Sequence, residues 1–248
     1  MTIRLATFRL DWGMSLLIAW ENNMAWINNY PEDQFASLWN QIGNDLEGCD
    51  SMQAATQTCV EGIYDTFADS IVLIRLFMML PLAKLPDRDQ AFVKQVSEDR
   101  DITSLLNEET LILSLLGTCG LESEWRDRYQ SKSYLGIPLV TSDFVRTMPM
   151  VAKLMDDLGI GLAWLDARDT DLVVRAMGGA AQTFYVADAK TAEDEAGRRV
   201  VVREDFVSTY DVQTVFGLGG SYVDGTLITM LVFTRESIAR SEVDRFQL

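Results

Sequence analysis

The chain has 248 residues, of which 48% are hydrophobic and 23% are charged, and this is ordinary usage for a globular protein with a substantial core. Its formal net charge of −16 excludes nucleic acid and anionic membrane surfaces as favoured partners, because both require Lys and Arg to neutralise phosphate groups. The chain contains no histidine, which excludes Ser-His-Asp, Cys-His and His-based zinc chemistry within it.

The first third of the chain is predicted to be helical. Apolar residues cover much of a helix circumference between residues 10 and 26, and a sharper helical spacing follows Pro31. Pro31 suits a first helical turn, and Ser51 is predicted to cap a further helix that reaches Phe67. The residues that define these last two helical faces are Phe35, Leu38, Trp39, Ile42, Leu46, Met52, Ala55, Cys59 and Ile63. No apolar run approaches the roughly 20 residues that a membrane span needs.

Strands predominate after Ser70. The segment IVLIRLFMML, residues 71–80, is rich in β-branched and aromatic residues and apolar on both faces, which predicts a strand in the middle of a covered sheet. A second buried strand is predicted from Thr110 to Gly120. The dipeptide Asp224-Gly225 favours a tight hairpin turn between the last two strands. The remaining strands are predicted at 160–165, 182–186, 212–223 and 226–234.

Short helices are predicted between these strands. Pro86 opens one, and Ser142 is expected to cap another, which Pro149 should kink or restart. Further helices are expected around Leu172 and from about Arg235, and residues 191–199 should form an exposed loop. This order predicts an α+β domain with one antiparallel sheet and helices on its faces. The N-terminal helical segment (1–68) is expected to pack as part of that domain, with the core spanning 69–248.

Few residue patterns carry a recognisable chemistry. The three cysteines lack metal or disulfide spacing, which favours a reduced, cytoplasmic protein and an inert thiol at Cys119. The glycines at 217–220 lie inside a strand pattern, which favours a close backbone approach over a phosphate loop. The carboxylates between Asp156 and Asp171 lack a calcium-loop arrangement and are expected to be solvated. No catalytic residue and no metal site is predicted, and no cofactor is identified.

Arginines near aromatic residues are the most informative feature for binding. Arg126 and Arg128 adjoin Trp125, and guanidinium groups beside rings can clamp a planar anion. Pairing of these arginines with neighbouring acidic side chains is the favoured alternative. Arg75 lies within an apolar strand, where a buried guanidinium either has a partner or faces a cavity. The methionines at 148–155 are expected to be adaptable core filler or the lining of a deformable pocket.

Five segments between Ser70 and Ile238 form a pattern that spans most of the chain. They are IVLIRLFMMLPLAKLPDRDQAF (71–92), LILSLLGTCGLESEWRDRYQSKSYLGIPL (111–139), SDFVRTMPMVAKLMDDLGI (142–160), FYV (184–186) and VQTVFGLGGSYVDGTLITMLVFTRESI (212–238). Together they resemble the GAF-like sensor domains that precede PAS, histidine-kinase or cyclase modules in bacterial signalling proteins. The resemblance implies a six-stranded antiparallel sheet between helices, a ligand pocket between the sheet and the connecting segments, and terminal helices that pair in a dimer and pass on the signal.

Two features depart from that pattern. The family has a His shortly before Ile-Pro-Leu, where this chain has Tyr134, so any ligand or metal held by that His must be held differently or not at all. The chain also stops within its last predicted helix. It is therefore expected to be either a stand-alone protein that acts on a partner or the sensory part of a longer one.

The sequence thus predicts a non-catalytic sensory domain. It is expected to bind a small ligand or respond to a redox signal, and to relay the change through its terminal helices to a signalling partner as a homodimer. One alternative is a structural dimerisation or protein-interaction domain without a ligand, and another is a hydrolase that uses carboxylates alone as acid and base. The residues predicted to line the ligand pocket are Arg75, Trp125, Arg128, Tyr134, Phe144, Tyr185 and Tyr210.

Overall fold

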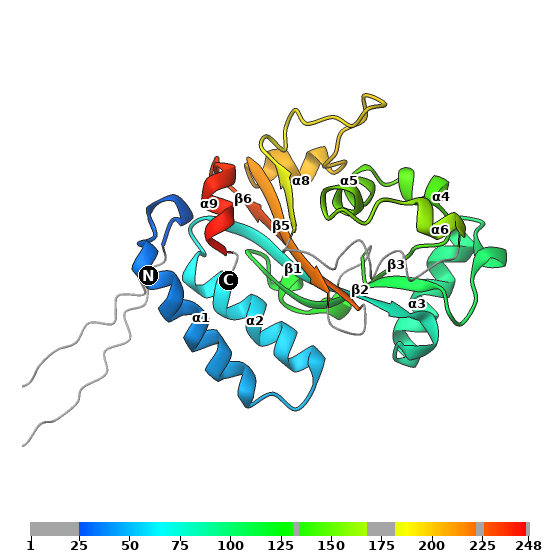
Figure 1. The fold of residues 1–248 in the computed structure, drawn as a ribbon, viewed down its shortest axis with the longest axis horizontal. Helices are drawn as coiled ribbons and strands as arrows, with labels where there is room; N and C mark the ends of the chain where they lie inside the picture. The colour runs from blue at the N-terminus through cyan, green and yellow to red at the C-terminus, as the bar shows by residue number, and fades with distance from the viewer. Residues whose placement is uncertain (1–24, 131–133, 168–181, 222–225, 247–248) are drawn as a thin grey trace, which may run out of the picture.

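The computed structural model describes residues 25–130, 134–167, 182–221 and 226–246. Its centre is a single six-stranded sheet in the order β3-β2-β1-β6-β5-β4, in which every neighbouring pair is antiparallel (Figure 1). The strands are β1 (Ile71–Pro81), β2 (Leu111–Gly120), β3 (Gly136–Pro138), β4 (Gln182–Val186), β5 (Thr214–Ser221) and β6 (Leu227–Thr234). The predicted α+β class with one antiparallel sheet is confirmed.

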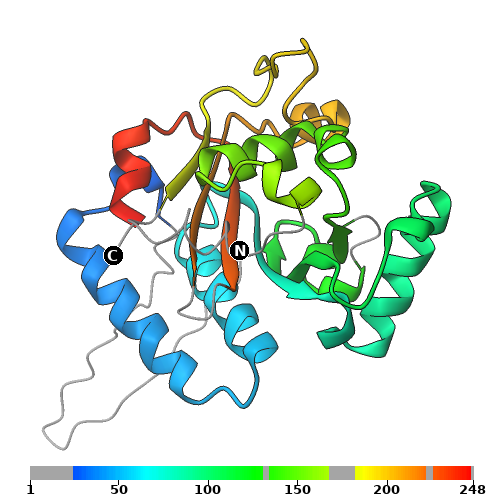
Figure 2. The ribbon, with the colours of Figure 1, turned by 45° about the vertical axis from the view of Figure 1, so that its right-hand side comes forward.

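One face of the sheet is covered by helices from the two ends of the described chain. The helices α1 (Glu32–Glu47) and α2 (Met52–Thr66) run side by side across it, and α9 (Arg240–Val243) lies next to them (Figures 1 and 2). Ser51 caps α2 as predicted, because its hydroxyl accepts a 3.2 Å hydrogen bond from the Ala54 amide. The buried side chains of this layer include Phe35, Leu38, Ile42, Ile63, Ile74, Leu76, Phe216, Val232, Val243 and Phe246.

Helix α2 lies directly on the backbone of β2. A Cβ atom added at Gly117 would lie 2.6 Å from the Thr56 carbonyl oxygen, so only glycine permits this approach. Next to it, the Gln57 side chain hydrogen-bonds the backbone of Thr118, at a part of β2 that lies beyond its pairing with β3. Its amide nitrogen donates to the Thr118 carbonyl at 3.0 Å, and its amide oxygen accepts from the Thr118 amide at 3.1 Å. The helical layer is therefore joined to the sheet by polar contacts as well as by apolar burial.

The opposite face of the sheet is covered by shorter elements. Helices α4 (Ser142–Arg146), α5 (Pro149–Asp157), α6 (Ala163–Ala167) and α8 (Glu204–Thr209) lie on it (Figure 2). Helix α3 (Asp87–Asp99) packs at the β3 edge of the sheet on the same face as α1 and α2, because Val93 meets Leu80 and Ile112, which alternate along their strands with Met79 and Leu113 of the opposite face. As predicted, Pro149 restarts a helix. Among the described residues, no helix is both long and apolar enough to cross a membrane.

Three local predictions are wrong. Residues 160–165 do not form a strand, because Gly159 and Gly161 adopt left-handed backbone angles (φ 72° and 62°) and lead into α6, which buries Trp164. The cap of α4 is Thr141, whose hydroxyl accepts from the Phe144 amide at 3.1 Å. Ser142 instead donates to Asp166 at 2.5 Å.

The third correction concerns the end of the chain, where the last helix begins at Arg240 rather than near Arg235. The preceding residues are held out of a helix by tertiary hydrogen bonds, because Glu236 accepts from the Ile27 amide at 2.9 Å and the Ile238 amide donates to Thr214 at 3.0 Å. The predicted helix around Leu172, the Asp224-Gly225 turn and most of the predicted helix at 10–26 lie outside the described residues. The division of the chain at residue 69 stays a prediction.

The contact between α2 and β2 leads to a test with two glycines. Gly117→Ala should lower the free energy of unfolding by about 1–3 kcal/mol, because the new methyl group overlaps helix backbone that cannot yield without moving α2. Gly43→Ala, on the exposed face of α1 with nothing within 4 Å of the new methyl, should raise it by about 0.5–1 kcal/mol. Urea unfolding measures both, and equal effects would contradict this account.

Candidate functional site

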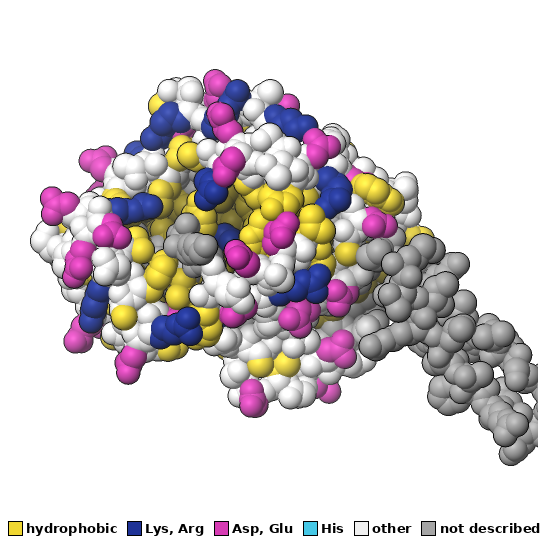
Figure 3. Space-filling model, turned by 180° about the vertical axis from the view of Figure 1, so that it is seen from behind, with side chains coloured by type: hydrophobic (Ala, Val, Ile, Leu, Met, Phe, Trp, Pro, Cys, Tyr) yellow, Lys and Arg dark blue, Asp and Glu magenta, His cyan; other side chains and the backbone are white. Residues whose placement is uncertain are grey.

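A cavity of about 350 Å³ opens on the face of the sheet opposite α1 and α2. Figure 3 shows this side of the molecule, with a hollow that has a hydrophobic lining, Lys or Arg side chains inside it, and side chains of both charges at its edge. The cavity lies between β1, β2 and β6 on one side and the start of α5, residues 200–206 and Tyr134 on the other. Its volume lies within the range of small-molecule sites.

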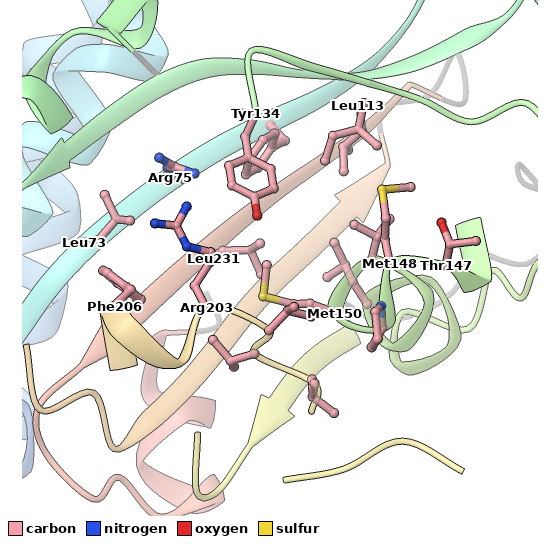
Figure 4. A pocket seen from close by; sticks show the side chains of 18 of the residues that line it. Leu73, Arg75, Leu113, Tyr134, Thr147, Met148, Met150, Arg203, Phe206 and Leu231 are labelled. Carbon is pink, nitrogen blue, oxygen red and sulfur yellow. The ribbon is translucent and has the colours of Figure 1, made fainter. Parts of the chain in front are cut away.

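Most of the cavity lining is apolar. Side chains alternate along a strand, so Leu73, Arg75 and Phe77 of β1 face the cavity while Ile74 and Leu76 face the helices. The apolar lining is completed by Leu113, Ile137, Leu231, Met148, Pro149, Met150, Val151, Leu154, Val200, Val201, Val202 and Phe206. Met148 and Met150, two of the methionines that were expected to fill the core or line a deformable pocket, line this cavity (Figure 4).

Arg75 brings a guanidinium group to the floor of the cavity. It lies in the middle of β1, between Thr118 of β2 and Leu231 of β6, so its backbone is fixed by the sheet on both sides. Its guanidinium carbon is 5.2 Å from the centre of the Tyr134 ring. Burial lowers the pKa of Arg75 to about 10, and the phenol of Tyr134 acts in the opposite direction. Arg75 is therefore charged at neutral pH.

Arg203 supplies a second guanidinium group from the residue before α8. Its Nε and Nη2 atoms donate to the two carboxylate oxygens of Asp205 at 3.1 and 2.9 Å. These hydrogen bonds raise the pKa of Arg203 and lower that of Asp205 to about 2. Tyr134 acts on the pKa of Arg203 as well as on that of Arg75, and Figure 4 shows both guanidinium groups beside its ring.

A third arginine, Arg100, lies at the edge of the cavity. Its Nη1 atom is 3.6 Å from the sulfur of Met148, and its guanidinium carbon is 5.7 Å from the centre of the Phe144 ring. Among the described lining residues, Arg75, Arg100 and Arg203 are the charged side chains, and none is an Asp or a Glu. The cavity is thus locally basic within a chain whose net charge is −16.

Aromatic rings close one end of the cavity. Trp125 lies 5.6 Å from Phe206 and 4.8 Å from Tyr210, measured between ring centres, and both pairs are edge-to-face. Tyr210 packs behind Trp125 without lining the cavity, and its hydroxyl lies 3.1 Å from a carboxylate oxygen of Glu122. This arrangement holds the Trp125 ring in place at the cavity wall.

The structure brings three of the seven predicted pocket residues to the cavity, namely Arg75, Trp125 and Tyr134. Phe144 and Tyr210 do not line the cavity. Phe144 contacts Arg100, and Tyr210 contacts Trp125. Tyr185 packs on the helical side of the sheet, where its hydroxyl donates to the Ile238 carbonyl at 2.7 Å. The sequence reasoning missed Arg100, Arg203 and Phe206. The run VVVREDF offered one signal, because Arg203 follows three valines as Arg75 follows an apolar segment.

Arg128 lies outside the cavity, in a buried polar network. Its side chain is 3% exposed, and it donates to Asp89 of α3 at 2.5 Å and to the Leu115 carbonyl of β2 at 2.6 Å. A longer contact of 3.5 Å reaches Gln53 of α2. This ion pair joins α3 and β2 to the short 3₁₀ turn at Arg128–Gln130. Arg128 therefore supports the segment that carries Trp125 and Tyr134.

The other sequence features have structural roles in the described chain. Gly217 and Gly219 lie within β5, where added Cβ atoms would lie 2.7 Å from the Met230 carbonyl oxygen and from the Leu158 side chain, in line with the predicted close approach. Within the described ranges, no three His, Cys, Asp or Glu residues cluster as a metal site would require. Cys119 is 1% exposed, and burial raises the pKa of its thiol to about 11.

The chain was compared with known protein families, curated proteins and solved structures. No family model and no curated protein matches the chain. Among solved structures, it is similar to the GAF domain from a phosphoenolpyruvate-protein phosphotransferase of Coxiella burnetii, with 13% identity and a TM-score of 0.43 over 87% of this chain and 88% of that one. At 13% identity few side chains are shared, so the character of the cavity follows from this chain's own residues. The six-stranded antiparallel sheet of this chain, with helices on both faces, agrees with the GAF-like architecture that the sequence resemblance implies.

Removal of one partner of the buried Arg128–Asp89 ion pair is expected to destabilise the protein strongly. Arg128→Met leaves the Asp89 carboxylate buried without its cation, and should reduce the free energy of unfolding by about 3–5 kcal/mol. The double variant Arg128→Met/Asp89→Leu should recover most of that loss, because no buried charge remains.

A surface pair gives the control. Lys190→Met removes the exposed partner of Asp211 and should leave urea unfolding nearly unchanged. A loss in the double variant as large as in Arg128→Met would contradict the electrostatic explanation.

The Cys119 thiol should be unreactive in the folded protein. At a pKa of about 11, about one thiol in a thousand is ionised at pH 8, against about a quarter at the ordinary value of 8.5. Iodoacetamide should therefore label Cys119 more than about 100-fold faster in urea than under native conditions, as peptide mapping would measure. Rapid labelling under native conditions would contradict this prediction and would favour a redox-sensing role for Cys119.

Proposed function

We propose that this chain is a non-catalytic sensory or regulatory domain that binds a small molecule in the cavity on the sheet. The observation that supports the proposal is the cavity itself, which combines an apolar lining with a small number of convergent polar groups. This combination is characteristic of small-molecule sites, because apolar contact supplies affinity and a few polar groups orient the ligand.

The chemistry of the lining favours binding over catalysis. The described lining residues include no carboxylate, thiol or lysine, and their polar side chains are three arginines, Tyr134, Thr147 and the indole of Trp125. General acid–base chemistry needs a group that can accept a proton near neutral pH. The carboxylate-only hydrolase considered from the sequence therefore finds no support among these residues.

The position of the cavity suggests how binding is relayed. Its floor is formed by β1 and β6, and the other faces of the same strands carry Ile74 and Val232, which pack in the core shared with α1, α2 and α9. A ligand that binds one arrangement of these strands and helices more tightly than another shifts the population toward it. The terminal helices then present a different surface to a signalling partner, or to a second copy of the chain in a homodimer.

Native mass spectrometry with a cavity-filling variant tests the proposal. The wild-type protein purified from cells should carry an extra mass that is lost on denaturation. Met150→Trp should remove that mass, because the indole occupies the cavity into which Met150 points (Figure 4). Met52→Trp makes the same exchange at an exposed position on α2 and should retain it.

Two other outcomes would contradict the proposal. A ligand retained equally by Met150→Trp would place binding elsewhere in the molecule. A wild-type dimer that carries no added mass, and that no small molecule stabilises in thermal unfolding, would favour the structural dimerisation domain instead.

A further inference from the structure

We infer that the ligand of this cavity is an organic anion, with an apolar body on the strands and a carboxylate or phosphate group held by Arg75 and Arg203. This inference rests on the proposed function and specifies the chemical class of its ligand. It follows from the charge of the lining, the geometry of the two guanidinium groups and the shape of the apolar floor.

The charge of the lining is opposite to that of the whole chain. The sequence has 37 acidic and 21 basic residues, yet all three charged side chains among the described lining residues are arginines. Like charges brought together in a partly dry cavity repel one another more strongly than in water. Asp205 is paired with Arg203 through both of its oxygens. An anion inside the cavity would lie among these arginines and reduce their mutual repulsion.

Arg75 and Arg203 are placed so that both can bind the same anionic group. Arg75 rises from the cavity floor and Arg203 from the opposite wall, and the ring of Tyr134 lies beside both guanidinium groups (Figure 4). A guanidinium group offers a planar fork of N–H donors that matches the oxygens of carboxylates and phosphates. The Nε–Nη2 edge of Arg203 is bonded to Asp205, so Arg203 would bind an anion through Nη1 and the second N–H of Nη2. Because Arg75 lies on the central strand, its position is fixed before a ligand arrives.

The start of α5 adds a smaller contribution of the same sign. Pro149, Met150 and Val151 of its first turn line the cavity, and within the described residues no side chain caps this helix. The positive end of a helix dipole favours a nearby anion. The helix alone would not define a site, but it acts in the same direction as the arginines.

The apolar floor and the volume limit the rest of the ligand. Leu73, Phe77 and Leu231 offer no hydrogen bonds, so the part of the ligand that rests on them is expected to be hydrocarbon. A cavity of about 350 Å³ has roughly the volume of a dozen water molecules. An aromatic or short aliphatic acid, or a monophosphate ester of similar size, fits this description.

Matched pairs of small compounds test the inference on the full chain. The probes are phenylacetate and octanoate, their neutral amides phenylacetamide and octanamide, phenyl phosphate, and inorganic phosphate alone. Binding is measured by ligand-observed NMR titration of ligand-free protein. Each anion should bind at least about 10-fold more tightly than its amide, and phenyl phosphate more tightly than inorganic phosphate. The tighter of phenylacetate and phenyl phosphate identifies the preferred head group.

Variants assign the effect to the two arginines. Arg75→Met and Arg203→Met keep the aliphatic stem, and each should weaken binding of the anions roughly 10- to 100-fold while changing binding of the amides little. Arg88→Met is the matched control, because Arg88 also lies over a tyrosine ring, 3.9 Å from that of Tyr129, but outside the cavity. Arg203 is exposed, so its variant should fold even if that of Arg75 does not.

The contradicting outcomes separate the two proposals. Equal binding of anions and amides to the wild type, or equal losses for both in Arg203→Met, would overturn the anion inference and leave a small-molecule site. Inorganic phosphate binding as tightly as phenyl phosphate would show that the apolar floor is not used. Failure of every probe to bind wild-type protein that also carries no ligand from cells would contradict the proposed function itself.

Discussion

The structure depends on one constraint, which is that β1 is apolar on both of its faces and must be covered on both. An antiparallel sheet can leave one face to solvent only when its strands alternate apolar and polar residues. Residues 71–80 do not alternate in this way, and β1 lies at the centre of the sheet, between β2 and β6. Helices α1, α2 and α9 satisfy the constraint on one face with a continuous layer.

The other face satisfies the same constraint only in part, and the cavity is the consequence. Its cover is assembled from α5, α8 and connecting segments, which pack closely around Val151, Leu154 and Leu158 but separate above Leu73 and Phe77. The residue of β1 at this place is Arg75, the one charged side chain in a strand of eleven residues. This charge in a largely buried strand lies beside the cavity and the ring of Tyr134.

The buried pair of Arg128 and Asp89 helps to define the cavity from outside it. The pair ties α3 to β2 and to the turn at Arg128–Gln130, which lies in the sequence between Trp125 and Tyr134. Both of these aromatic residues line the cavity. Arg128 does not line the cavity, but it fixes to β2 and α3 the turn that follows Trp125, and supporting residues of this kind are common around binding sites.

The sequence by itself determined the fold class, the positions of β1, β2, β4, β5 and β6 and of the helices from α1 to α5, and the absence of histidine chemistry, but it did not predict β3, α6 or α8. These properties follow from local periodicity and composition, because an apolar run or a helical spacing is complete within a dozen residues. It also singled out Arg75, since a charge in an apolar strand is visible without any partner. Only the tertiary structure decided which arginines share the cavity. Arg75 and Arg203 are far apart in the chain, and the sequence did not single out Arg203. Arg128 was a candidate pocket residue like Arg75, and the fold pairs it with Asp89 of a distant helix. It likewise decided that residues 160–165 turn and form a helix, because burial against a neighbouring helix satisfies an apolar run as well as a strand does.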